Sequence, residues 1–105
     1  MNPIQLVGRE AWIDCEVKPG PFSDERMVRV KSNGTTWVGF THTEQLHSPV
    51  PEQGPSKIKI RLLDFADGRF TAKVLGYAVT SQAIQVTLGE VQVFDSQQAG
   101  NRPLS

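Results

Sequence analysis

The dipeptide Asn33-Gly34 constrains the fold of this chain more than any other feature. It lies inside the segment from Glu25 to Leu46, ERMVRVKSNGTTWVGFTHTEQL, between two runs rich in β-branched and aromatic residues. An Asn-Gly pair in such a setting is the strongest short-range signal of a β-hairpin, because both residues tolerate the left-handed backbone of a tight turn. The sequence therefore predicts two antiparallel strands joined at this dipeptide.

This hairpin has two registers open to it, and they turn different side chains inward. A two-residue turn at Asn33-Gly34 places Val30 opposite Trp37, and each face then mixes apolar and charged residues. A three-residue loop with a bulge places Val28 opposite Val38. We predict the bulged register, because it gives the core a purely apolar face. The inward side chains of that register are Val28, Val30, Val38 and Phe40.

Several other segments have the alternation or the turn residues of short strands. Residues 10–18 alternate well and place Cys15 on an inward, apolar face. Residues 57–75 predict a second hairpin that turns at Asp67-Gly68, with a bulge or bend where the apolar parity changes after Leu62. Residues 84–93 indicate one bulged strand or two short ones. The fold class is therefore all-β, a small barrel or two-layer sandwich of about six to eight mainly antiparallel strands.

The sequence also predicts the structure of three segments between the strands. Pro19-Gly20-Pro21 ends the first strand, and we expect Phe22 to fold back into the core. The segment THTEQL has few strand formers and predicts one 3₁₀ turn with Leu46 pointing inward. Residues 48–56 hold three prolines and a glycine, so we expect a long loop within one domain.

Length and composition set the broad class. A chain of 105 residues fits one domain, which we place at residues 1–94, with the polar residues 95–105 as a flexible tail. The formal net charge is zero, which argues against a polybasic membrane-binding surface. No apolar run approaches the roughly 18 residues of a membrane helix. The single Cys15 excludes an internal disulfide, so we expect a cytoplasmic protein.

The segment from Gly39 to Leu46, which follows Trp37, resembles part of an SH3-like small β-barrel. In that fold a strand with a Gly-aromatic pair, here Gly39-Phe40, runs into a single 3₁₀ turn and closes on an apolar residue. The resemblance covers about residues 9–47 and implies an SH3-like first half. The groove of peptide-binding SH3 domains is not implied, because the chain lacks the tyrosine-rich first strand and its only tyrosine is Tyr77. Fold by itself does not set function.

Catalytic and metal chemistry find little support in the sequence. His42 and His47, with Glu44, form too sparse a ligand set for a metal site. Cys15 has no histidine near it that would activate a thiolate, and a small buried side chain is its ordinary role. We therefore expect no enzyme activity, no cofactor and no metal.

Three outward residues form the favoured binding surface: Trp12, Arg29 and Trp37. In the bulged register Arg29 lies across from Trp37, where a cation–π contact would contribute about 0.5–1 kcal/mol. Outward tryptophans on a small sheet indicate a recognition surface. We expect a non-enzymatic binding module whose partner is a protein or a second copy of the chain. The alternative is that another layer covers both tryptophans as core.

A basic second hairpin supports a different function. From Lys57 to Leu75, five basic residues meet two acidic ones, which leaves a charge of +3. With a bulged turn at Asp67-Gly68, Arg61 lies opposite Lys73, and an anionic partner would relieve that repulsion. The alternative function is therefore a nucleic-acid-associated small barrel that uses Lys57, Lys59, Arg61 and Lys73. Solvated lysines that protect an edge strand remain the simpler explanation.

Overall fold

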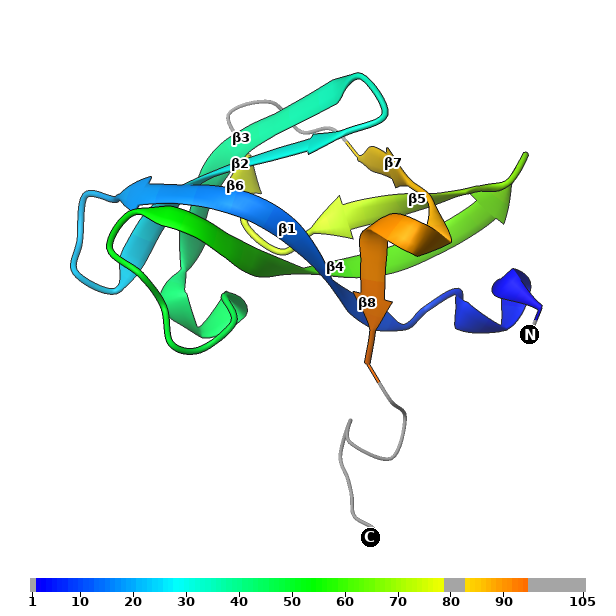
Figure 1. The fold of residues 1–105 in the computed structure, drawn as a ribbon, viewed down its shortest axis with the longest axis horizontal. Helices are drawn as coiled ribbons and strands as arrows, with labels where there is room; N and C mark the ends of the chain where they lie inside the picture. The colour runs from blue at the N-terminus through cyan, green and yellow to red at the C-terminus, as the bar shows by residue number, and fades with distance from the viewer. Residues whose placement is uncertain (1, 79–82, 95–105) are drawn as a thin grey trace, which may run out of the picture.

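The computed structural model describes residues 2–78 and 83–94, which form one mainly antiparallel sheet curled into a nearly closed small barrel (Figure 1). The all-β prediction is therefore confirmed. The predicted tail at residues 95–105 lies outside the described residues. The strands are β1 (Glu10–Pro19), β2 (Glu25–Ser32), β3 (Thr35–His42), β4 (Gly54–Ala66), β5 (Arg69–Val74), β6 (Tyr77–Ala78), β7 (Ile84–Val86) and β8 (Val91–Val93). The short 3₁₀ helices are η1 (Pro3–Leu6), η2 (Thr43–Gln45) and η3 (Leu88–Glu90).

The strands follow the order β6-β3-β2-β1-β4-β5-β7, and β8 pairs with β1 off this path. One edge of β1 pairs with β4 from Glu10 to Val17. The other edge is divided, because residues 11–13 pair with β8 and residues 16–19 pair with β2. The sheet therefore forks between β8 and β2 at Asp14 and Cys15 of β1 (Figure 1).

The first hairpin has the two-residue turn, so the bulged register predicted from the sequence is wrong. Asn33 and Gly34 have φ angles of 50° and 80°, which are the left-handed values of a tight type I′ turn. Val30 lies opposite Trp37, and the Trp37 side chain is only 3% exposed. Val38, expected inward, points outward with 36% exposure.

Partners outside the hairpin explain why its inner face can hold polar residues. The hydroxyl of Thr41 donates to the carbonyl of Leu75 at 2.8 Å. The guanidinium of Arg26 donates to three backbone carbonyls, one of them in the loop after η2. A buried polar group costs little stability when it is hydrogen-bonded. A rule that requires a purely apolar inner face therefore selects the wrong register here.

The second hairpin forms as predicted at Asp67-Gly68, again with positive φ at both turn residues. The register shifts between Leu62 and Asp64, which confirms the bulge expected at the change of parity. Arg61 lies opposite Lys73, also as expected. The extra residue is Leu63 in β4, however, and not a residue of the turn, which holds only two residues.

The core fills the barrel with side chains from most of the strands, with Leu6 of η1 and with Leu46, which follows η2. Leu46 is buried at the end of η2, and Cys15 is buried on β1, both as predicted. The expectation for Phe22 is wrong, because its side chain is 67% exposed. The largest fully buried side chains include Phe70, Ile58, Ile60, Leu62 and Ile84.

Side-chain hydrogen bonds close the barrel where the tip of the β2–β3 hairpin meets β7 (Figure 1). The Asn33 amide donates to the Gln85 carbonyl at 2.8 Å and to the Glu90 carboxylate at 3.0 Å. The Ser32 hydroxyl lies 2.8 Å from both of these acceptor groups. Glu90 also accepts from the backbone N–H of Thr87, which completes a capping box on η3.

Candidate interaction surface

The structure does not bring together the three residues of the predicted binding surface. Trp37 lies in the core and Arg29 points outward from β2, so the two are on opposite faces of the sheet. Arg29 lies opposite Val38, and its guanidinium pairs with Glu16 at 3.0 Å. The expected Arg29–Trp37 contact is therefore wrong, for the same reason as the register.

Trp12 points outward from β1, as predicted, but other side chains cover part of it. The ring centroids of Phe94 and His47 each lie 5.1 Å from that of Trp12, and the His47 ring meets Trp12 in a T-shaped arrangement. The Lys59 ammonium sits 5.9 Å from the Trp12 ring centroid and 6.0 Å from that of Phe94. Trp12 is half-buried in this aromatic cluster, which partly matches the alternative that a further layer covers it.

Acidic residues on β1 offset the basic residues of the second hairpin. Lys57 pairs with Asp14 at 2.7 Å, and Arg61 pairs with Glu10 at 2.8 Å. Lys73 is exposed and has no ion pair within residues 2–78 and 83–94. The excess charge counted along the hairpin is therefore reduced by a neighbouring strand, which a count along the chain does not show.

Apolar side chains gather on the outer face of β2, β3 and β6. Met27 lies opposite Phe40, and Phe40 lies opposite Tyr77, so the three form one row across the strands. Val38 lies two residues from Phe40 on the same face, and Met27 and Tyr77 are 37% and 64% exposed. We call Met27, Val38, Phe40 and Tyr77 the apolar strip.

Sequence reasoning missed the apolar strip because the wrong register turned Val38 and Phe40 inward. One signal of the correct register was available in the sequence, because an Asn-Gly pair most often forms a two-residue hairpin turn. That turn places the apolar residues at positions 27, 38 and 40 on one face, which is the outer face in the structure.

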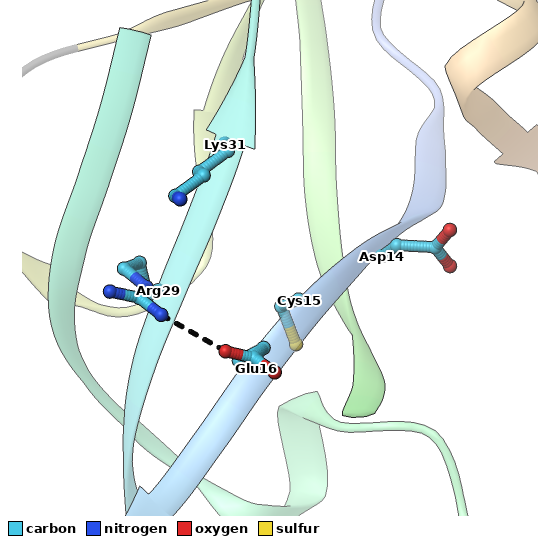
Figure 2. Close-up of a pocket in the computed structure, with 5 residues that line it drawn as sticks. All are labelled: Asp14, Cys15, Glu16, Arg29 and Lys31. Atoms are coloured by element: carbon cyan, nitrogen blue, oxygen red, sulfur yellow. Dashed lines mark hydrogen bonds and ion pairs between the residues drawn. The ribbon is translucent and has the colours of Figure 1, made fainter. Parts of the chain in front are cut away.

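Two shallow depressions meet at Arg29 and Glu16, next to the apolar strip. The first, of about 300 Å³, lies at the fork of the sheet and is lined by Asp14, Cys15, Glu16, Arg29 and Lys31. Figure 2 shows Glu16 reaching toward Arg29, while Asp14 points away from β2. The second, of about 170 Å³, is lined by Glu16, Lys18, Met27, Val28, Arg29 and Val38.

Cys15 borders the first depression, but its thiol is poorly suited to nucleophilic chemistry. Burial, together with the nearby carboxylates of Asp14 and Glu16, raises the pKa of Cys15 to about 12. The reactive species is the thiolate, which is scarce at neutral pH when the pKa is this high. The predicted burial of Cys15 is confirmed.

The two histidines lie apart and pack against aromatic rings. His42 meets Tyr77 edge-on with ring centroids 5.8 Å apart, and His47 meets Trp12. Within residues 2–78 and 83–94, no three His, Cys, Asp or Glu side chains are grouped as metal ligands would be. In the same described ranges, no helix has the length and apolar character needed to cross a membrane.

Comparisons with protein-family models, with curated proteins and with solved structures gave no match. Function therefore has to be inferred from the geometry of the surface. Within that geometry, the apolar strip and the two depressions beside it form one continuous outer face that combines apolar and charged side chains.

Proposed function

We propose that this chain is a non-enzymatic protein-interaction module that binds its partner through the apolar strip. The observation that carries the proposal is the outward row Met27, Phe40 and Tyr77, with Val38 beside it; Met27, Val38 and Tyr77 are exposed and Phe40 is half-buried. Soluble domains seldom expose large contiguous apolar patches without a role in recognition. Tyrosine, phenylalanine and methionine are also enriched at the centre of protein interfaces.

The scaffold under the strip supports this role. The inner faces of β2 and β3 are held by Val28, Val30 and Trp37, all buried in the core. A binding surface on rigid strands loses little conformational entropy when a partner docks. Arg29 is the one member of the sequence-predicted surface that lies beside the strip.

Selection from a random-peptide display library tests the proposal. We expect peptides selected on the wild-type chain to lose binding to Val38→Lys, because this change places a charge on the strip, two residues from Phe40 on the same face. Leu63→Lys is the matched control, since Leu63 is also an exposed apolar residue but lies on the β4 bulge. Selected peptides that bind both variants as well as wild type would contradict the proposal.

A second copy of the chain is one form that the partner can take. Light scattering after size exclusion distinguishes the two cases. A dimer that Val38→Lys converts to a monomer would make the strip a homodimer interface. A monomer at all concentrations would leave a foreign protein as the partner.

The nucleic-acid alternative rests mainly on Lys73 and Lys59. Lys57 and Arg61 are held in ion pairs with Asp14 and Glu10, which leaves them less available to phosphates. If the alternative were right, oligonucleotide binding at low ionic strength would be strong and would weaken steeply with salt. Lys73→Glu would then reduce binding, whereas Val38→Lys would not.

Two further expectations from the sequence, the SH3-like resemblance and the cytoplasmic location, are also part of the proposal. The order β1, β2, β3 and η2 over residues 9–47 supports the SH3-like resemblance, which remains a proposal about fold family. The buried thiol of Cys15 is compatible with the reducing cytoplasm that we propose as its location.

A further inference from the structure

We infer that the partner of the apolar strip is an extended peptide segment that carries acidic as well as apolar side chains. The inference rests on the proposed function and adds the chemistry of the partner. Its basis is the pair Lys18 and Lys31, which flank the strip and the fork. Both side chains are exposed, and neither belongs to an ion pair in the described part of the chain.

Among the charged residues that line the two depressions, all except these two lysines have an ion-pair partner. Glu16 pairs with Arg29, and Asp14 pairs with Lys57 on the far side of β1. Carboxylates from a partner would therefore find Lys18 and Lys31 without an internal competitor. Complementary charge of this kind steers association and selects among partners.

The two depressions place these lysines beside sites that can receive side chains of a partner. The smaller one holds Met27 and Val38 together with Lys18, so it suits an apolar side chain next to a carboxylate. The larger one holds Lys31 at the fork. Arg29 lies between them and uses one nitrogen, Nη2, for Glu16, which leaves other N–H donors of its guanidinium for a ligand. An extended segment that crosses Arg29 would reach both depressions.

The side of the strip away from Lys31 has a different charge. Glu25, at the start of β2, lies opposite His42 of β3. An acidic side chain of the partner would be repelled there, so the carboxylates are expected near Lys18, which lies opposite Met27 at the end of the row, and on the side of the strip toward Lys31. This asymmetry gives the bound segment a preferred direction.

Three synthetic peptides test the inference by fluorescence anisotropy. All alternate valine and leucine with one variable residue, which is aspartate in the first, serine in the second and lysine in the third. We expect the aspartate peptide to bind tightest, about tenfold tighter than the lysine peptide at low salt. The difference should shrink as salt rises, because the lysines are exposed.

Charge-reversal variants locate the preference. The double variant Lys18→Glu with Lys31→Glu should weaken binding of the aspartate peptide about three- to tenfold and strengthen binding of the lysine peptide. Lys73→Glu is the matched control, because Lys73 is also exposed and unpaired but lies on β5. Lys73→Glu should leave the affinity for both peptides unchanged. Unchanged thermal unfolding of each variant will show that the fold is intact.

The outcomes separate the partner chemistry from the proposed function. Equal binding of all three peptides, or tightest binding of the lysine peptide, would overturn the inference. If Val38→Lys still abolished that binding, the strip would remain the interaction surface. Failure of all three peptides to bind wild type would overturn the inference, and display selection would then decide the proposed function independently.

Discussion

Trp37 is the residue on which the account of the hairpin depends. Its ring lies on the inner face against Gly76, where an added Cβ would come within 3.0 Å of the ring and 2.7 Å of the Phe40 carbonyl. Such close approach of the backbone requires glycine. The side chain that the sequence assigned to binding is therefore a core residue that also fixes how the chain enters β6.

Single-tryptophan variants will test this burial. Trp12→Phe leaves Trp37 as the only tryptophan, and its emission should be blue-shifted and resistant to iodide, because the ring is excluded from water. Trp37→Phe leaves the half-buried Trp12, which should be quenched more strongly. Equal quenching of the two variants would show that Trp37 is not in the core.

Cys15 gives a second test at the scale of one side chain. Since burial raises the pKa of its thiol to about 12, it should react slowly with a disulfide reagent at pH 8. The same reagent should label it rapidly in concentrated urea, which serves as the control. Stoichiometric labelling of the folded protein at the unfolded rate would contradict the burial of Cys15.

Among the elements, the two hairpins share one device. Both turns place an Asx residue and a glycine at positive φ, which gives the strands the twist that a small barrel needs. In the first hairpin this turn also decides the outer face, because a shift of one residue would bury Val38 and expose Trp37. The turn and the apolar strip are therefore consequences of one register.

Glycine substitutions separate the turn from other loops. Gly34→Ala should destabilise the fold by about 1–2 kcal/mol, because Gly34 is at φ 80° and an L-residue is strained there. Gly89→Ala is the matched control, since Gly89 has open space around it and no positive φ. It should change stability by less than about 1 kcal/mol. Urea midpoints will measure both, and equal losses would contradict the type I′ turn.

The sequence predicts the elements of this fold better than their faces. The strand at residues 10–18, the turn at Asp67-Gly68, the bulge after Leu62 and the 3₁₀ turn before Leu46 all follow from local patterns. The apolar alternation does not give the register of the first hairpin, because its inner face depends on carbonyls of distant segments that accept from Ser32, Thr41 and Arg26. Such partners are visible only in three dimensions.

The candidate surface was mispredicted for the same reason. Apolar alternation along the hairpin predicts the bulged register, which puts Trp37 on the outer face of the sheet, whereas the Asn-Gly turn predicts the register that buries it. The ion pairs of Lys57 and Arg61 were missed because their acidic partners belong to a strand more than 40 residues away. Of the favoured surface, the outward direction of Trp12 and Arg29 was predictable from the alternation of their strands.

At the scale of the whole molecule, Glu90 links η3 to the tip of the first hairpin and so closes the barrel. Partial burial opposes its charged form, but hydrogen bonds from Thr87, Ser32 and Asn33 outweigh this effect and lower the pKa of Glu90. The folded state therefore binds this proton less readily than the unfolded state does. Its stabilisation is complete above the unfolded pKa, roughly 4.3, and is lost as the pH falls through the lower, folded pKa.

Urea unfolding as a function of pH will test this closure. Glu90→Gln should lower the urea midpoint at pH 7, and the difference from wild type should shrink as the pH falls from the unfolded pKa, roughly 4.3, through the lower pKa of Glu90 in the folded protein. Glu52→Gln is the control, because Glu52 is exposed in the loop before β4. An equal effect of the two substitutions at pH 7 would show that Glu90 does not hold the hairpin.

The apolar strip is a property of the whole barrel, since it needs β6 beside β3 as well as the correct hairpin register. Its role as a binding surface is most directly tested by nuclear magnetic resonance titration with a peptide selected on the wild-type chain. We predict that the largest amide shift changes fall on Met27, Val38, Phe40 and Tyr77 and on neighbouring Arg29. Changes centred on Trp12 and Lys59 instead, with the strip unaffected, would contradict the account.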